Sequence, residues 1–89
     1  MSQYAKDWQK AYRQGRLEEI NAYKLERGCM DCGYAVAAVA LDFDHRPGEE
    51  KLANVANLVT ASAERLYAEI AKCDVVCANC HRIRTEGRR

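Results

Sequence analysis

Two Cys-x-x-Cys pairs are the residues whose spacing most clearly fits a chemistry. Cys29 and Cys32 form the first pair, and Cys77 and Cys80 form the second. Two intervening residues let both thiolates of a turn face one ion, and two such turns complete a tetrahedral four-cysteine zinc site. A redox pair and two unrelated motifs are the alternatives, although a redox pair needs a βαβ context that this sequence lacks. The spacing predicts a structural zinc ion.

The fifth cysteine, Cys73, stands apart from this pattern. It could replace one of the paired cysteines, but the three-residue gap to Cys77 fits a metal-binding turn less well. We expect it to be a small buried apolar residue. An odd cysteine count and a polar start without a signal-peptide core favour a cytosolic protein, in which paired thiols bind metal more often than they form disulfides.

The chain has only two histidines, and each lies beside a residue suited to metal chemistry. Asp44 offers a hard oxygen ligand for Mg²⁺ or Mn²⁺, and the adjacent His45 can accept a proton near neutral pH. His81 directly follows Cys80. A zinc ion bound by Cys80 would fix this turn and hold His81 in place as a second ligand of the Mg²⁺ or Mn²⁺ ion. The alternatives are a surface histidine at a strand end for His45, and a zinc ligand or an exposed side chain for His81.

Charge and size add weaker constraints. The net charge of the 89-residue chain is +1, so overall charge does not predict nucleic-acid binding. Both ends are basic and residues 29–48 are acidic, an arrangement that suits a divalent cation facing a polyanion but also describes ordinary solvated surface. A chain this short buries a limited core and often needs a metal as a staple.

The elements that must position these residues can be predicted from periodicity and caps. Residues 3–27 predict one long helix or two shorter ones divided at Gly15, with Gly28 as the helix-ending glycine. Ser62 is an expected N-cap. The remaining segments are a hairpin or two strands over 34–43, a strand or short helix over 52–59, a helix over 63–72, a short strand at 75–76 and a helix from near 79.

Together the strings LDFDHR and CDVVCANCHRIRT resemble the zinc-containing branch of the small HNH nucleases, over about residues 28–86. The resemblance implies an α+β chain with the ββα-metal fold, in which two strands and a helix clasp one catalytic divalent ion. It also implies two parts, an N-terminal helical extension at 1–27 and a nuclease domain at 28–89 carrying the four-cysteine zinc site.

The resemblance assigns roles position by position. It makes His45 the general base, Asp44 and His81 the ligands of a catalytic Mg²⁺ or Mn²⁺, and the two cysteine pairs the ligands of a structural zinc. The family places an asparagine that orients the base nine positions before the final histidine, where this chain has Lys72. Asn79 is the preferred substitute, with helix capping as its alternative role, and Asn57 is a second candidate.

The implied activity is hydrolysis of DNA phosphodiester bonds, as nicks that leave 5′-phosphate and 3′-hydroxyl ends. Arg46, Arg82 and Arg84 are the candidates for holding flanking phosphates. The implied partner is DNA rather than a membrane, with a monomer or homodimer as the working unit and phage packaging proteins as further partners. The rival hypotheses are a zinc-binding nucleic-acid module without catalysis and a protein-interaction module that uses the N-terminal helix.

Overall fold

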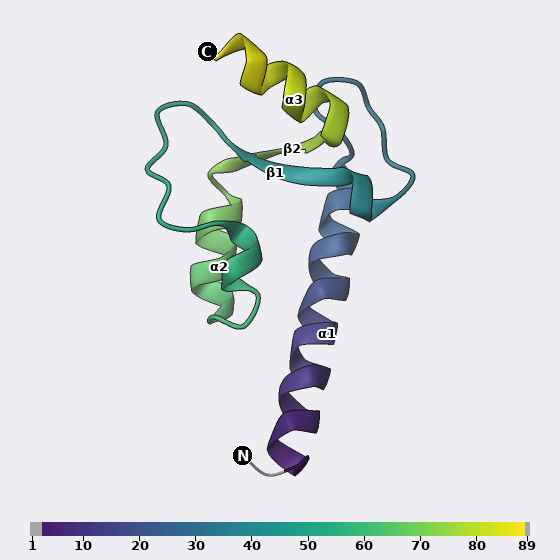
Figure 1. Cartoon of the computed structure of the whole chain (residues 1–89), viewed down its shortest axis with the longest axis vertical. Coiled ribbons are helices and arrows are strands. Elements are labelled where there is room, and N and C mark those ends of the chain that lie inside the picture. Colours follow the sequence, from purple (N-terminus) through teal and green to yellow (C-terminus); the bar gives the residue numbers. More distant parts are fainter. Residues whose placement is uncertain (1–2, 89) are drawn as a thin grey trace.

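Residues 3–88 fold as a small α+β arrangement of three α-helices and one two-stranded antiparallel sheet (Figure 1). The structure is a computed structural model that describes residues 3–88, and their side chains from residue 7 onward. Residues 1, 2 and 89, which belong to the expected ranges 1–27 and 28–89, lie outside the described residues. The elements are α1 (Gln3–Arg27), β1 (Leu41–His45), α2 (Ala63–Ile70), β2 (Cys73–Cys77) and α3 (Ala78–Gly87), with 3₁₀ helices η1 (Ala38–Ala40) and η2 (Val55–Leu58).

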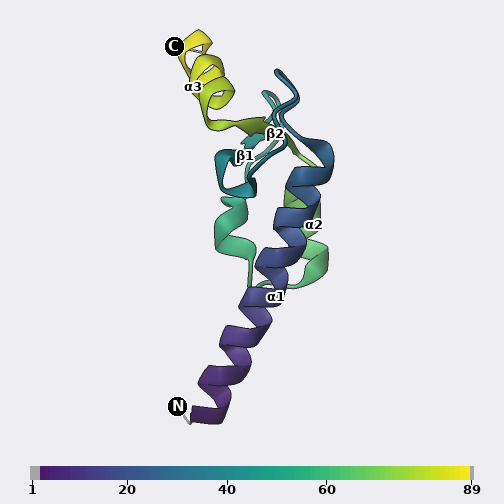
Figure 2. The ribbon, with the colours of Figure 1, turned by 90° about the vertical axis from the view of Figure 1, so that its right-hand side faces the viewer.

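The sheet separates α3 on one face from α1 and α2 on the other, as both ribbon views show (Figures 1 and 2). Leu41 pairs with Cys77 at one end of the ladder and His45 pairs with Cys73 at the other. The hairpin or strand pair expected over 34–43 is therefore wrong. That segment contains no asparagine or glycine for a two-residue hairpin turn, and the apolar Val75 and Val76 of β2 provide a better-buried partner for β1.

The first helix runs unbroken through Gly15, so one long helix forms rather than two. Gly28 ends it with a φ of +67°, a left-handed conformation that favours glycine, and its amide donates to the Lys24 carbonyl over 2.8 Å. The half of α1 before Gly15 projects away from the sheet (Figure 2) and leaves Trp8 60% exposed. In the described part of the chain, no helix has the length and apolar character that a membrane crossing requires.

Two apolar clusters stabilise this arrangement. One lies between α1, η2 and α2 and is centred on Leu66, whose full burial contributes about 1.5–3 kcal/mol. The other lies around the strands and includes Leu41, Val76 and the two buried paired cysteines. Phe43 packs against both clusters, so one side chain of β1 joins the helical layer to the sheet.

The segment between the strands folds back as η2 and α2. The ambiguous stretch 52–59 becomes the 3₁₀ helix, with Val55 and Leu58 buried. Ser62 is confirmed as the N-cap of α2, since its hydroxyl accepts the Arg65 amide over 3.2 Å. The helix ends at Ile70, two residues before the expected 72, because the chain turns there into a β2 strand that is longer than predicted at its start.

Candidate functional site

The two cysteine pairs come together, as predicted, at the junction of the first turn, β2 and α3. The four sulfur atoms all lie within 4.8 Å of one another, and the Sγ atoms of Cys32 and Cys77 are 3.7 Å apart. Zinc–sulfur bonds of about 2.3 Å in a tetrahedron require sulfurs about 3.8 Å apart. All five cysteines are free thiols. The four paired ones could therefore hold a metal ion, and their chemistry suits zinc.

Backbone hydrogen bonds hold this cluster in place. The amide of Met30 donates to the Val75 carbonyl over 2.8 Å, which ties the first turn to β2. Gly33, with a φ of +83°, donates its amide to the Cys29 carbonyl over 2.8 Å and closes that turn. In the second turn, the Cys80 amide donates to the Cys77 sulfur. Two local turns and one strand therefore position all four sulfurs.

The thiols of this cluster have opposed acidities. Burial acts to raise the pKa of Cys29, but surrounding backbone amides, first that of Cys77, outweigh it and lower the pKa to about 6. Hydrogen bonding to the Cys77 thiol raises the pKa of Cys80. Thiols this close compete for one negative charge, and a bound cation removes that competition.

Cys73 takes no part in this cluster. It is 8% exposed and lies in the helical core, where its thiol contacts the Glu69 carbonyl at 3.5 Å. Burial raises its pKa to about 11, so it remains a neutral thiol. The expectation of a small buried apolar residue is confirmed.

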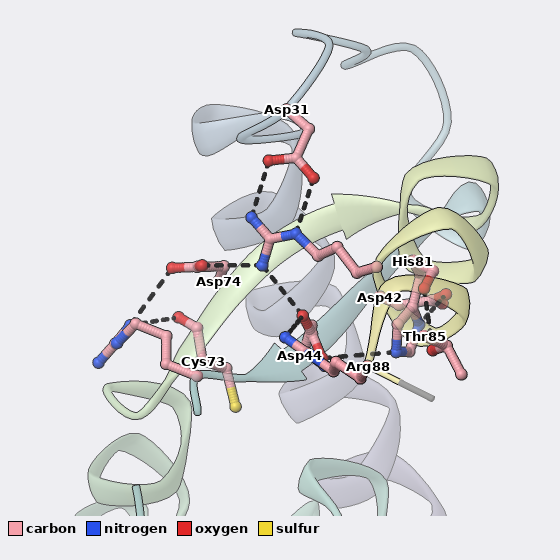
Figure 3. Close-up of polar contacts among 10 residues, drawn as sticks. Asp31, Asp42, Asp44, Cys73, Asp74, His81, Thr85 and Arg88 are labelled. Atoms are coloured by element: carbon pink, nitrogen blue, oxygen red, sulfur yellow. Dashed lines mark hydrogen bonds and ion pairs between the residues drawn. The ribbon is translucent and has the colours of Figure 1, made fainter. Parts of the chain in front are cut away.

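A second polar cluster joins β1 to α3. Because Asp42 and Asp44 are two residues apart on a strand, both carboxylates point to the α3 face of the sheet and meet His81 (Figure 3). His81 Nδ1 lies 3.0 Å from an oxygen of Asp42, and its Nε2 lies 3.6 Å from an oxygen of Asp44. The ring of His81 therefore lies between the two carboxylates, with one nitrogen facing each.

Arg84 of α3 and Arg88, which follows that helix, neutralise the carboxylate of Asp44, which is 4% exposed. Arg88 makes two hydrogen bonds of 2.9 and 3.0 Å to its two oxygens, and Arg84 adds a third of 3.0 Å. Burial acts to raise the pKa of Asp44, but the hydrogen bonds from Arg88 and Arg84 outweigh it and lower the pKa below its ordinary value of 3.8. Asp44 is therefore an ionised carboxylate at neutral pH.

The guanidinium of Arg84 connects three parts of the chain. It donates twice over 2.7 Å to Asp31, which lies between the first two cysteines. It also donates over 2.9 Å to Asp74 of β2, and these ion pairs, first that with Asp31, raise its pKa. Arg84 therefore links the cysteine cluster to the β1 carboxylate.

His45 points to the opposite face of β1, toward α2. Its Nε2 atom lies 2.7 Å from Oε2 of Glu69, whose side chain is 3% exposed. Burial acts to raise the pKa of Glu69, but hydrogen bonds from His45, Lys72 and the Leu52 amide bring it down to about 2. Since Glu69 is ionised and can only accept, His45 Nε2 is the donor in this contact.

A cleft of about 690 Å³ receives residues from both faces of β1. Asp44, His45 and His81 all line it, so the structure brings the three predicted catalytic residues to one cavity. The cleft lies along β1 between α1, η2 and the end of the chain. Its basic lining residues are Arg13, Lys24, Lys51 and Arg88, none of which was predicted from the sequence.

The predicted phosphate-binding arginines lie elsewhere. Arg46 folds back on the end of α2 and on β2, where it donates to the Ala71 and Cys73 carbonyls. Arg82 is exposed on α3, and Arg84 is held among three carboxylates. Their contact with DNA remains a prediction.

The orienting residue predicted from the sequence, Asn79, does not line the cleft. Asn79 is exposed in the first turn of α3, and the N-cap of that helix is Cys77 rather than Asn79. Glu69 was not predicted from the sequence, although its position among apolar residues could have identified it. It belongs to the spacing Leu66, Glu69 and Ile70, which forms one helical stripe, and a charged residue in an apolar stripe needs a buried partner.

No protein-family model matches the chain, and no curated protein or solved structure is significantly similar to it. The geometry of the cysteine cluster and of the cleft therefore carries the functional argument.

Proposed function

We propose that the protein is a metal-dependent DNA endonuclease of the HNH type, with a ββα-metal unit formed by β1, β2 and α3. One observation carries the proposal. A buried, ionised Asp44 and Nε2 of His81 are 3.6 Å apart in a cleft that His45 also lines. A carboxylate beside an imidazole suits Mg²⁺ or Mn²⁺, and a separate histidine suits a general base.

The donor set fits such an ion. Two ligands of one octahedral ion at about 2.1 Å lie about 3 Å apart, close to the separation of Asp44 and His81. Asp42 fixes the ring of His81, as the second hydrogen bond of a metal-binding histidine usually does. Bound there by Asp44 and His81, the ion would supply charge stabilisation for the scissile phosphate and the leaving 3′ oxygen.

The chain's own residues account for the other parts of the reaction. His45 Nδ1 accepts the proton of the attacking water, while the cleft lysines and arginines hold neighbouring phosphates without reading sequence. The four-cysteine zinc site stays outside the chemistry and anchors α3, the helix that carries His81. The products are nicked strands with 5′-phosphate and 3′-hydroxyl ends.

A second candidate is a zinc-stapled DNA-binding module without turnover. The observation that favours it is the occupation of Asp44 by Arg84 and Arg88, whose three hydrogen bonds compete with a metal for the same oxygens. Under this alternative the cleft binds phosphates and the carboxylates only hold the arginines in place.

Nicking of supercoiled plasmid separates these candidates. Purified protein is incubated with plasmid in Mn²⁺, in Mg²⁺ and in a chelator too weak to strip the zinc, beside a DNA-binding measurement under the same conditions. Nicked circles that need the added metal support the endonuclease. DNA binding without nicks in either metal supports the binding module. A protein that neither binds nor nicks DNA would contradict both candidate functions.

A further inference from the structure

Glu69, whose carboxylate contacts His45, is an unusual residue because it is charged and yet buried. Glu69 is a charged residue on the apolar stripe of α2 and is 2% exposed. A buried charge is strongly destabilising unless its partners replace the lost water. Glu69 has three such partners in His45, Lys72 and the Leu52 amide, at 2.7, 3.1 and 3.2 Å.

We propose that Glu69 is the positioning residue for His45, and that it fixes the proton on Nε2 so that Nδ1 is the nitrogen free to act in the cleft. This inference rests on the proposed function, because it concerns the base of that reaction. Oε2 of Glu69 accepts from the ring, and the same oxygen accepts the Leu52 amide. The carboxylate is therefore anchored by backbone and can define the ring orientation.

Lys72 completes the arrangement. Its ammonium donates to Oε1 of Glu69 over 3.1 Å and to the Glu50 carbonyl over 2.7 Å, so it fixes the second carboxylate oxygen to the loop before η2. Its backbone carbonyl accepts the amide of Arg46, the residue after the base, over 3.0 Å. The lysine at the position of the expected asparagine thus supports the base indirectly, through Glu69 and through the backbone.

A purely structural staple is the competing explanation, since the same contacts join α2, β1 and the loop after β1. The two explanations differ in what they require of the imidazole. A staple needs only that the segments remain joined, whereas a positioning residue sets the tautomer of His45 and acts on the reaction only while His45 is present.

The first test reads the tautomer directly in the full-length, zinc-loaded protein. Long-range ¹H–¹⁵N correlation spectra of the two histidines, assigned with His81→Ala, report which ring nitrogen carries the proton. We expect His45 of the parent to carry it on Nε2, and Glu69→Gln to mix the two tautomers. A parent His45 protonated on Nδ1 would overturn the inference without any need for a variant.

The second test uses nicking rates. Glu69→Gln keeps the shape and an acceptor oxygen, and Glu64→Gln is the matched control on the exposed side of the same helix. We expect Glu69→Gln to lower kcat about 10–100-fold with KM unchanged, as loss of a residue that orients a functional histidine does. In a His45→Ala background the same change should have no further effect. A further loss there, or a loss in Asn79→Ala instead of Glu69→Gln, would contradict the assignment.

The two tests separate this inference from the proposed function. If the parent does not nick plasmid but His45 shows the Nε2-protonated tautomer that Glu69→Gln disturbs, the nuclease proposal fails and the positioning by Glu69 stands. If the parent nicks and Glu69→Gln nicks at the parental rate, the positioning fails and the nuclease stands.

Discussion

The cysteine cluster and the carboxylate–histidine cleft share β1, β2 and α3 but are assembled in different ways. The cluster draws its four sulfurs from two local turns, and the pairing of one strand brings those turns together. The cleft draws its groups from both faces of β1 and from α1, η2 and α3, and arginines already balance its buried carboxylate. The first region could therefore be held together by an ion, and we propose that the second exchanges arginine for a metal.

The largest expected effect separates the two regions by stability. A structural zinc contributes on the order of 10 kcal/mol to folding. Cys32→Ala should therefore lose both zinc and the cooperative thermal transition, whereas Cys73→Ala should keep about one zinc per chain, since it removes the one cysteine outside the cluster. Metal content and circular dichroism measure both. A folded Cys32→Ala protein without zinc would contradict the staple role.

The next effect concerns the ligand in the cleft. His81→Ala removes one of two proposed protein ligands, so Mn²⁺ affinity should fall by more than about tenfold while zinc content stays at the parental level. Titration calorimetry with Mn²⁺ beside metal analysis gives both numbers. Release of zinc by His81→Ala would place His81 in the structural site. The cysteine cluster and the cleft would then not be two separate metal sites.

A smaller effect tests whether the cleft exchanges arginine for metal. Arg88 is 39% exposed in its side chain, and solvent screening makes exposed ion pairs weak. Arg88→Ala should therefore tighten Mn²⁺ binding by about 1.4–5-fold. Arg82→Ala removes the same charge from the exposed surface of α3 and serves as the control. Weaker Mn²⁺ binding in Arg88→Ala alone would mean that Arg88 helps to hold the metal site in shape.

The smallest effect concerns phosphate contacts. Lys51 lines the cleft, so Lys51→Ala should reduce the slope of log affinity against log salt by about 0.9, the contribution of one phosphate. Lys10 lies on the projecting part of α1 outside the cleft, so Lys10→Ala should leave the slope unchanged. Fluorescence anisotropy with a short duplex at several salt concentrations measures both. Equal changes in the two variants would place DNA on α1 instead.

The cysteine cluster could be predicted from the sequence because its spacing is local. Each pair needs only two intervening residues, and the single long-range step is the pairing of β1 with β2. Helix α1 and the Ser62 cap were equally local features and are confirmed. The α+β class was implied by the family resemblance and is confirmed.

The surroundings of the cleft could not be predicted in this way. The partner of His45 lies 24 positions along the chain, and the partners of Arg84 lie 10 to 53 positions away. Such contacts depend on where the strands pair, and the hairpin expected over 34–43 placed the first strand too early. The only sequence signal for the burial of Glu69 was a charged residue among the apolar residues of one helix face.

The most direct test of the nuclease proposal is the plasmid-nicking rate of His45→Ala, measured at matched zinc content and with Mn²⁺ saturating by titration. If His45 is the base and the metal is held by Asp44 and His81, the rate should fall about 10²–10⁴-fold while Mn²⁺ affinity remains parental. Nicking at the parental rate by His45→Ala would contradict the proposed function, because the proposed base would then contribute nothing to the reaction.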